Sequence, residues 1–328
     1  MAQRDRSNFT SNLKGTKRKK AITGALKRTD KKRQRSRRLT GGLVERVGLD
    51  RARLRKWNEK ERKRRIAEYE KWFRSATRAL TGAPPPLRIV AEGDSWFKYP
   101  HPNSARKGVV KPLADLLGVK IGNLAEAGDE ARTILGVVQR KELEETLRTQ
   151  PPYDILLFSG GGNDVVGDPM CLWIRQWQGG QPPESHLDKA RFGSILSLIR
   201  MAYEDLIALR NKYSPNTWIF LNGYDFPIPD GRGACQYGPW LKPSLDYRGV
   251  PSPQGFPEGR AIVRAMLVEF AKMLQEIAKA KNVVFVPTQG TLADNQWANE
   301  LHPSDPGFDS VAKVFYDAIK AKFPDRVK

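Results

Sequence analysis

From residue 87 to residue 322, short apolar runs alternate with longer segments in which apolar residues recur every three or four positions. The first pattern is typical of buried strands and the second of amphipathic helices. The predicted strands are 87–94, 119–125, 153–161, 216–225 and 282–288, and the predicted helices are about 106–117, 131–148, 193–213, 259–281 and 304–322. Such alternation predicts an α/β domain with a doubly wound, parallel, five-stranded sheet covered on both faces.

The first 80 residues differ from this pattern in charge. They hold 28 of the 57 Lys and Arg but only 8 of the 36 Asp and Glu, and so carry +20 of the formal net charge of +21. In residues 1–40, basic clusters alternate with Ser, Thr and Gly, a composition that buries too little apolar surface to fold, and we predict disorder. Residues 43–80 are predicted to be helical. The Pro-rich stretch 81–88 is predicted to link this basic arm to a domain at 89–328.

Two interpretations of the helical part of the arm are open. Residues 43–57 resemble a helix-turn-helix core with Gly48 at the turn, which would direct basic side chains to DNA. The alternative is a tether that docks on the domain through one apolar face, and we favour it because the motif is short. That face comprises Ile66, Tyr69, Phe73, Ala76 and Leu80. Nonspecific binding to nucleic acid or anionic lipid is a further hypothesis, based on charge density; its candidate residues are Arg51, Arg53, Arg55, Arg62 and Arg64.

The composition excludes several classes of protein. No apolar run reaches the roughly 18 residues of a membrane helix, and no secretory signal is recognisable, so we expect a cytoplasmic protein that is not an integral membrane protein. Two cysteines, Cys171 and Cys235, are too few for a disulfide scaffold or a four-cysteine zinc site. They would form a bridge only in an oxidising compartment. No metal or organic cofactor is predicted, because His, Cys and carboxylates show no ligand spacing.

Residues of types that can take part in catalysis follow the ends of the predicted strands. Gly93-Asp94-Ser95-Trp96 ends the first strand, 123–128 follows the second, and Gly160-Gly161-Gly162-Asn163-Asp164 ends the third. His302 lies just before the last predicted helix. Because the carboxyl ends of parallel strands meet at one edge of the sheet, these blocks are expected to form one site.

In their order and spacing, these four blocks resemble the SGNH (GDSL-type) hydrolases over residues 87–322. The resemblance implies a three-layer, flavodoxin-like fold in which Ser95 is the nucleophile and His302 the general base. It also implies an oxyanion hole formed by the backbone N–H groups of Ser95 and Gly128 and by the side chain of Asn163. Acyl transfer needs these three functions together.

The chain departs from the family pattern at the third member of the triad. The position three residues before His302, where the family has Asp, is Asn299. Three explanations are open: Asn299 or a backbone carbonyl orients His302, a nearby carboxylate of Asp294 or Glu300 replaces the acid, or the enzyme is weak or inactive. We favour a local carbonyl or Asp294.

Two long segments leave the predicted sheet at the same edge, at 165–186 and 226–259. Insertions of this length often form lids or binding loops. Their aromatic residues Trp173, Tyr237 and Trp240, together with Trp96 beside the nucleophile, are candidates for substrate binding. The alternative is that the aromatic side chains only pack the two loops together, or pack behind the nucleophile in the case of Trp96.

These observations predict a serine esterase or lipase-type hydrolase that cleaves acyl or acetyl esters through an acyl-enzyme. One alternative is a weak or inactive hydrolase fold whose basic arm binds nucleic acid or an anionic membrane. Another is an acyltransferase or a carbohydrate deacetylase that uses the same serine.

Overall fold

The computed structural model describes residues 48–79, 85–101, 103–234 and 237–327, without the side chains of 48–58 and 79. Five strands form one sheet in the order β2-β1-β3-β4-β5, and every neighbouring pair is parallel. The strands are β1 Ile89–Gly93, β2 Gly122–Asn123, β3 Ile155–Ser159, β4 Trp218–Asn222 and β5 Val283–Val286. The predicted doubly wound, flavodoxin-like sheet is therefore confirmed.

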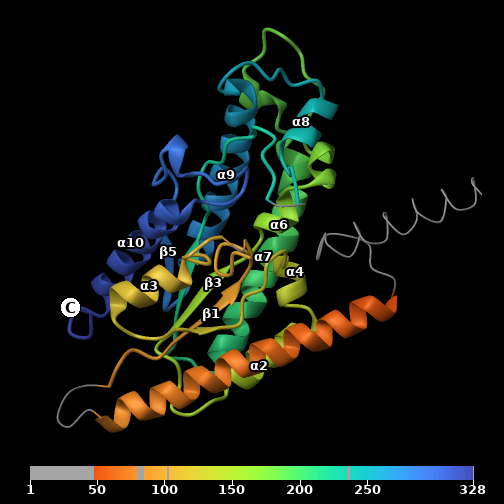
Figure 1. The fold of residues 1–328 in the computed structure, drawn as a ribbon. Helices are drawn as coiled ribbons and strands as arrows, with labels where there is room; N and C mark the ends of the chain where they lie inside the picture. Colours follow the sequence, from red (N-terminus) through yellow and green to blue (C-terminus); the bar gives the residue numbers. More distant parts are fainter. Residues whose placement is uncertain (1–47, 80–84, 102, 235–236, 328) are drawn as a thin grey trace, which may run out of the picture. The chain divides into compact units, whose positions relative to one another are not determined.

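Helices cover both faces of the sheet and bury its apolar residues (Figure 1). On one face, α3 (Val110–Leu117) packs against α10 (Asp305–Lys322). On the other face, α7 packs against α4, α5 and α9. The bounds of these four helices are α4 Ala131–Ile134, α5 Val137–Leu147, α7 Lys189–Tyr213 and α9 Pro257–Ile277. Both sides of the central strands β1 and β3 are thereby buried, which explains their continuous apolar runs.

Two predicted helices differ from the structure at identifiable residues. The helix expected over 131–148 is divided into α4 and α5, because Gly136 adopts an extended conformation between them. The helix expected from 106 begins only at Val110. Just before it, the backbone N–H of Ala105 donates to the Asp305 carboxylate at 2.9 Å. This contact holds residues ahead of α3 in a turn.

The insertions pack against each other at the carboxyl edge of the sheet. The helix α6 (Gly162–Val165) leads into the first insertion, which contains two short 3-10 helices, Asp168–Leu172 and Pro183–His186. The second contains α8, Lys242–Tyr247. Backbone hydrogen bonds join them from Gly167 to Trp240 and from Trp177 to Arg248. The two loops thus support one another beside the strand ends.

The helix α2 (Gly48–Ala79) belongs to the same compact unit as the sheet, a unit that begins at Val47. The charge pattern had placed the boundary after residue 80 instead. Tyr69 and Phe73 are buried in the core, and the Tyr69 hydroxyl accepts a hydrogen bond from the N–H of Ile89. Residues 1–47 and 80–84, which include the predicted disordered segment, lie outside the described residues.

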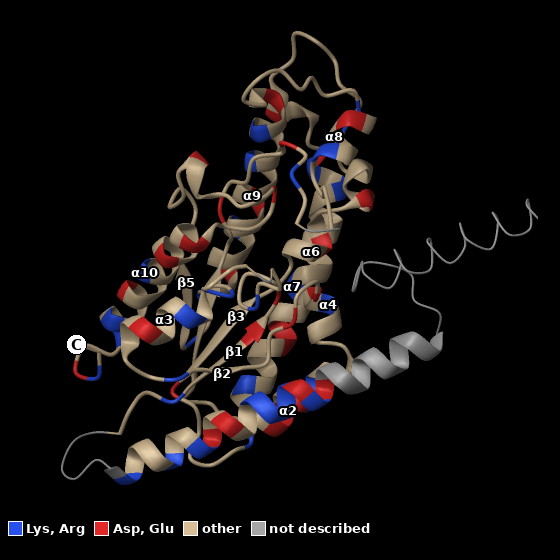
Figure 2. Ribbon diagram, viewed as in Figure 1, with Lys and Arg blue, Asp and Glu red and all other residues tan. Residues whose placement is uncertain are grey.

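Charges on the described part of α2 are mixed rather than uniformly basic (Figure 2). Arg62, predicted to face a polyanion, is instead buried in an ion pair with Glu142 of α5 at 2.5 Å. Arg64 is exposed and pairs with Glu61 and Glu68 on its own helix. The backbone of 51–55 is helical, but the side chains of Arg51, Arg53 and Arg55 lie outside the described residues.

A carboxyl group is buried within β1. Glu92 is 2% exposed, and burial raises its pKa to about 8, with a further increase from the nearby Asp129. Burial also raises the pKa of Asp129 to about 7. Two protons that an unfolded chain would release in weak acid are therefore retained by the folded protein near neutral pH.

We expect the protein to lose stability as the pH rises toward 8. Between the unfolded pKa of Glu92 and its folded value, the native state binds more protons, so the free energy of unfolding falls by up to about 1.4 kcal/mol per pH unit for this group. Thermal melts from pH 6 to 8.5 should show a steeper decrease in Tm for the wild type than for Glu92→Gln, which cannot ionise. The exposed Glu68→Gln serves as control and should follow the wild type. Parallel curves for wild type and Glu92→Gln would contradict the assignment.

Candidate active site

Ser95 lies in the turn that follows β1, at the carboxyl edge of the sheet. Gly93 precedes it with a φ of +156°, and a Cβ there would lie 2.4 Å from the carbonyl oxygen of Ser159 on β3. Only glycine fits this approach without displacing the neighbouring strand. Asp94 fixes the turn: its buried carboxylate accepts hydrogen bonds from Trp96 N at 3.0 Å and from the Tyr224 hydroxyl at 2.6 Å. Burial raises the pKa of Asp94 to about 6.

His302 is brought to Ser95 from the far end of the chain. It lies in the loop before α10, and its Nε2 is 2.7 Å from Ser95 Oγ. Its Nδ1 is 2.9 Å from Oδ1 of Asn299. The same Oδ1 also accepts the backbone N–H groups of Leu301 and His302, at 3.0 and 3.1 Å. An atom that accepts two backbone donors must be the amide oxygen, so Nδ1 carries the proton and Nε2 is free to accept from Ser95.

Aromatic side chains enclose the imidazole of His302. Tyr99 lies against it with ring centroids 4.7 Å apart, and Trp240 of the second insertion contacts it edge to face at 5.5 Å. Tyr99 also accepts a hydrogen bond from Nδ2 of Asn299 through its hydroxyl, at 3.0 Å. Burial lowers the pKa of His302 to about 3. The ring is therefore neutral, and able to accept a proton, throughout the physiological pH range.

Neither carboxylate considered as a replacement acid contacts His302. Asp294 is exposed and forms a two-point ion pair with Arg260 of α9, at 2.6 and 2.8 Å. The preference for Asp294 is thus wrong in this structure. Glu300 is fully buried, but its carboxylate accepts four backbone N–H groups of the second insertion, those of Gly231, Trp240, Leu241 and Lys242. It anchors this insertion, including the backbone of Trp240.

The residues predicted to form an oxyanion hole lie in adjoining segments. Nδ2 of Asn163 donates to the backbone carbonyl of Asp129 at 2.8 Å, which joins α6 to the loop that carries Gly128. Gly128 has a left-handed φ of +86°. With acceptors drawn from the described residues, no hydrogen bond uses the backbone N–H of Ser95 or that of Gly128. Both donors are therefore available to an incoming oxygen.

An apolar cavity opens beside Ser95. Trp96 lines it and is anchored by a hydrogen bond from Nε1 to the Leu301 carbonyl at 2.9 Å. Asn163 also lines the cavity, together with residues from α6, α9 and the second insertion. Among these are Val165, Pro227, Leu241, Val263, Met266 and Leu267. An uncharged acyl chain or other apolar group would match this lining.

The insertion aromatics have different roles from one another. Trp173 is buried against Phe192 of α7, which supports the packing interpretation over a substrate contact. Tyr237 is half-buried and forms a bridge with Ala234. Trp240 covers His302 as described above. None of these three lines the cavity among the described residues.

The described part of the chain was also compared with the expectations for a disulfide, a metal site and a membrane helix. Cys171 has no disulfide partner among the described residues, and Cys235, and with it the possible bridge between the two, lies outside them. No cluster of His, Cys, Asp or Glu among the described residues could hold a metal ion. Within that part of the chain, no helix combines the length and apolar character needed to cross a bilayer.

A family comparison agrees with this geometry. The model of the GDSL-like Lipase/Acylhydrolase family matches residues 91–309, which contain the Ser95, Gly128, Asn163 and His302 blocks. The chain belongs to this family. As a GDSL-like hydrolase it has Asn299 at the position where the family resemblance predicts an acid. No curated protein matches the sequence.

Several solved structures are similar to this GDSL-like chain. The lipase Lip_vut3 from a goat rumen metagenome is 17% identical, with 71% of this chain and 97% of that one covered and a TM-score of 0.46. An extracellular lipase from Streptomyces rimosus is 16% identical, with 71% and 99% covered and a TM-score of 0.47. A carbohydrate esterase family 3 protein from Talaromyces cellulolyticus is 15% identical, with 73% and 99% covered and a TM-score of 0.42. The family assignment comes from the family model.

Sequence reasoning missed two residues that shape this site, Tyr99 and Tyr224, and considered a third, Glu300, only as a replacement acid. Tyr99 supports both His302 and Asn299, Tyr224 ties Asp94 to the N–H of Gly162, and Glu300 anchors the second insertion. Tyr224 lies near the carboxyl end of the predicted strand 216–225 and could have been singled out from that position. Tyr99 and Glu300 carry no local signal, because their partners are remote in sequence.

Proposed function

We propose that this protein is a serine hydrolase that cleaves carboxylic esters through an acyl-enzyme on Ser95. The observation that carries the proposal is the continuous relay from Ser95 Oγ to His302 Nε2, and from His302 Nδ1 to Asn299 Oδ1, at 2.7 and 2.9 Å. The relay fixes the tautomer that a general base requires. It lies beside an apolar cavity that Ser95 and Asn163 line.

In the acylation step, Ser95 Oγ attacks the ester carbonyl carbon while Nε2 of His302 takes the hydroxyl proton. The carbonyl π electrons move to oxygen, and the N–H groups of Ser95 and Gly128 with the Asn163 amide would stabilise the resulting oxyanion. When the C–O bond to the alcohol breaks, His302 returns the proton to the departing oxygen. The products are a neutral alcohol and an acyl group on Ser95.

In the deacylation step, a water molecule replaces the alcohol. His302 takes a proton from this water, whose oxygen attacks the acyl carbon, and the bond to Ser95 Oγ then breaks. Ser95 recovers the proton from His302, and a carboxylic acid leaves. Throughout both steps Asn299 holds the ring by its amide oxygen rather than by a charge.

The test is to detect the acyl-enzyme directly. Full-length protein would be mixed with p-nitrophenyl acetate and p-nitrophenyl butyrate, quenched in acid and analysed by intact mass and peptide mapping. We expect p-nitrophenol release with turnover, and a mass increase of one acyl group on the peptide that contains Ser95. Absence of turnover, or acylation confined to another residue, would refute the proposal.

A further inference from the structure

Outside the family-matched segment, α2 contacts the catalytic domain at the edge strand β2. A Cβ on Gly122 would lie only 3.1 Å from the Tyr69 ring and 3.2 Å from the Ile66 side chain, so α2 packs directly on this strand. The strand has only two residues and one neighbouring strand, β1. Apart from β1, the contacts that hold β2 in place therefore include those with α2.

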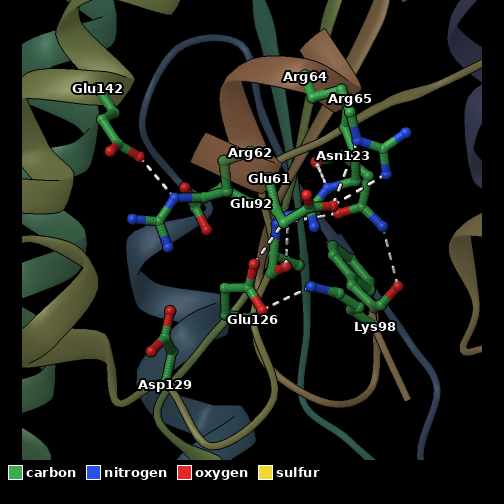
Figure 3. Close-up of polar contacts among 12 residues, drawn as sticks. Glu61, Arg62, Arg64, Arg65, Glu92, Lys98, Asn123, Glu126, Asp129 and Glu142 are labelled. Carbon is green, nitrogen blue, oxygen red and sulfur yellow. Dashed lines mark hydrogen bonds and ion pairs between the residues drawn. The ribbon is translucent and has the colours of Figure 1, made fainter. Parts of the chain in front are cut away.

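Arg65 of α2 binds the chain where β2 ends and the loop 124–128, the glycine loop that carries Gly128, begins (Figure 3). Its Nε donates to the Asn123 carbonyl at 2.8 Å, and its Nη2 donates to the Ala125 carbonyl at 3.3 Å. The same Nη2 forms an ion pair with Glu126 at 3.0 Å. A single guanidinium thus restrains both the backbone and a side chain of residues 123–126.

The same segment is tied to the loop of the nucleophile. The second carboxylate oxygen of Glu126 accepts from Nζ of Lys98 at 2.6 Å, and the Glu126 N–H donates to the Gly93 carbonyl at 2.9 Å. Nδ2 of Asn123 donates to the Phe97 carbonyl at 3.1 Å. Residues 123–126 are therefore the link between α2 and the turn that carries Ser95.

Directly after this segment come the groups assigned to the oxyanion. Gly128 is two residues beyond Glu126, and the Asp129 carbonyl accepts from the Asn163 side chain. A shift of 123–126 would be transmitted to both. Donors to an oxyanion must be placed closely, and a displacement of 1 Å can cost about 10²-fold in rate.

We propose that Arg65 is a positioning residue for the proposed oxyanion donors of the active site. By this proposal, α2 contributes to the rate of the hydrolase reaction. The inference rests on the proposed function. Arginine suits this role because its planar fork can serve two carbonyls and a carboxylate in fixed geometry, whereas lysine offers one compact charge. Arg65 touches neither substrate nor the reacting atoms.

The test compares full-length Arg65→Met and Arg65→Lys with Arg74→Met, a control on an exposed position of the same helix. We expect Arg65→Met to lower kcat for p-nitrophenyl acetate about 10-fold while KM changes less than twofold, because the transition state loses aligned donors. The rate of Ser95 labelling by a fluorophosphonate should fall by a similar factor. Arg65→Lys should lie between Arg65→Met and the wild type, and Arg74→Met should match the wild type.

Stability is controlled separately from positioning. Each variant would be assayed well below its own Tm, and hydrogen exchange would be measured at 122–130. We expect the largest increase in exchange there in Arg65→Met, a smaller one in Arg65→Lys and none in Arg74→Met.

Four outcomes overturn the proposal: wild-type kcat in Arg65→Met, an increase in KM alone, equal losses in Arg74→Met, or unchanged exchange at 122–130. A wild-type protein that neither turns over esters nor labels would refute the proposed function itself. Full wild-type activity with an unaffected Arg65→Met would refute only the role of Arg65.

Discussion

Replacing Ser95 with alanine is expected to lower kcat for ester hydrolysis by about 10⁴-fold or more, because no acyl-enzyme can form. His302→Ala should cause a loss of similar size, since Ser95 Oγ then has no base within hydrogen-bond distance among the described residues. Fluorophosphonate labelling should disappear in both variants. The exposed Ser194→Ala on α7 is the matched control and should keep wild-type kcat and labelling.

The double variant makes this first prediction more specific. If Ser95 and His302 act as one unit, Ser95→Ala combined with His302→Ala should be no slower than the worse single variant. Additive losses would show that the two residues act separately. Substantial activity in Ser95→Ala would mean that a different nucleophile performs the reaction.

Replacing Asn299 with leucine is expected to lower kcat by about 10²-fold to 10³-fold. The expected reason is loss of the contact that holds the proton on Nδ1, since in serine proteases an altered tautomer costs about 10⁴-fold. Leucine has a similar size but cannot accept from His302 Nδ1 or from the two backbone N–H groups that Oδ1 now accepts. The measurement is kcat, with Tm recorded to exclude unfolding. Retention of full activity would show that His302 needs no orienting group.

A second variant, Asn299→Asp, tests what a carboxylate at this position would change. A carboxylate at the position of Oδ1 would stabilise the imidazolium and raise the pKa of His302 from about 3. Because the base must be unprotonated in the free enzyme, the acidic limb of kcat/KM should move to higher pH in this variant. In the wild type, the titration of His302 should instead produce no acidic limb between pH 8 and about 5. We expect kcat at pH 8 in Asn299→Asp to equal or exceed that of the wild type.

The use of an amide in this position has a physical explanation in the surroundings of His302. Tyr99, Trp240 and Asn299 leave the imidazole only 5% exposed, so a neutral ring is strongly favoured over a charged one. The amide oxygen supplies orientation without a second buried charge, whose desolvation is costly. The wild type therefore has a base that stays unprotonated in mild acid, but its imidazolium lacks a carboxylate partner among the described residues.

Local patterns in the sequence were sufficient to predict the sheet and the edge at which the candidate site residues lie. Apolar runs followed by Gly-Asp-Ser, by the glycine loop and by Gly-Gly-Asn-Asp were sufficient to predict five parallel strands whose ends meet at one edge. This was possible because strand periodicity and the chemistry at strand ends are local properties of the chain. The proximity of Ser95 to His302, 207 residues later, followed from the same topology.

The pairing of polar groups, in contrast, became known from the folded arrangement. The sequence left Asn299 and Asp294 open as partners for His302 and we favoured a local carbonyl or Asp294, but an ion pair with Arg260 engages Asp294 in the fold. Arg62 and Arg65 look alike within a basic run, yet the fold buries one against Glu142 and places the other on the end of β2. Pairing between remote residues depends on helix packing and burial, which leave no periodic signal in the sequence.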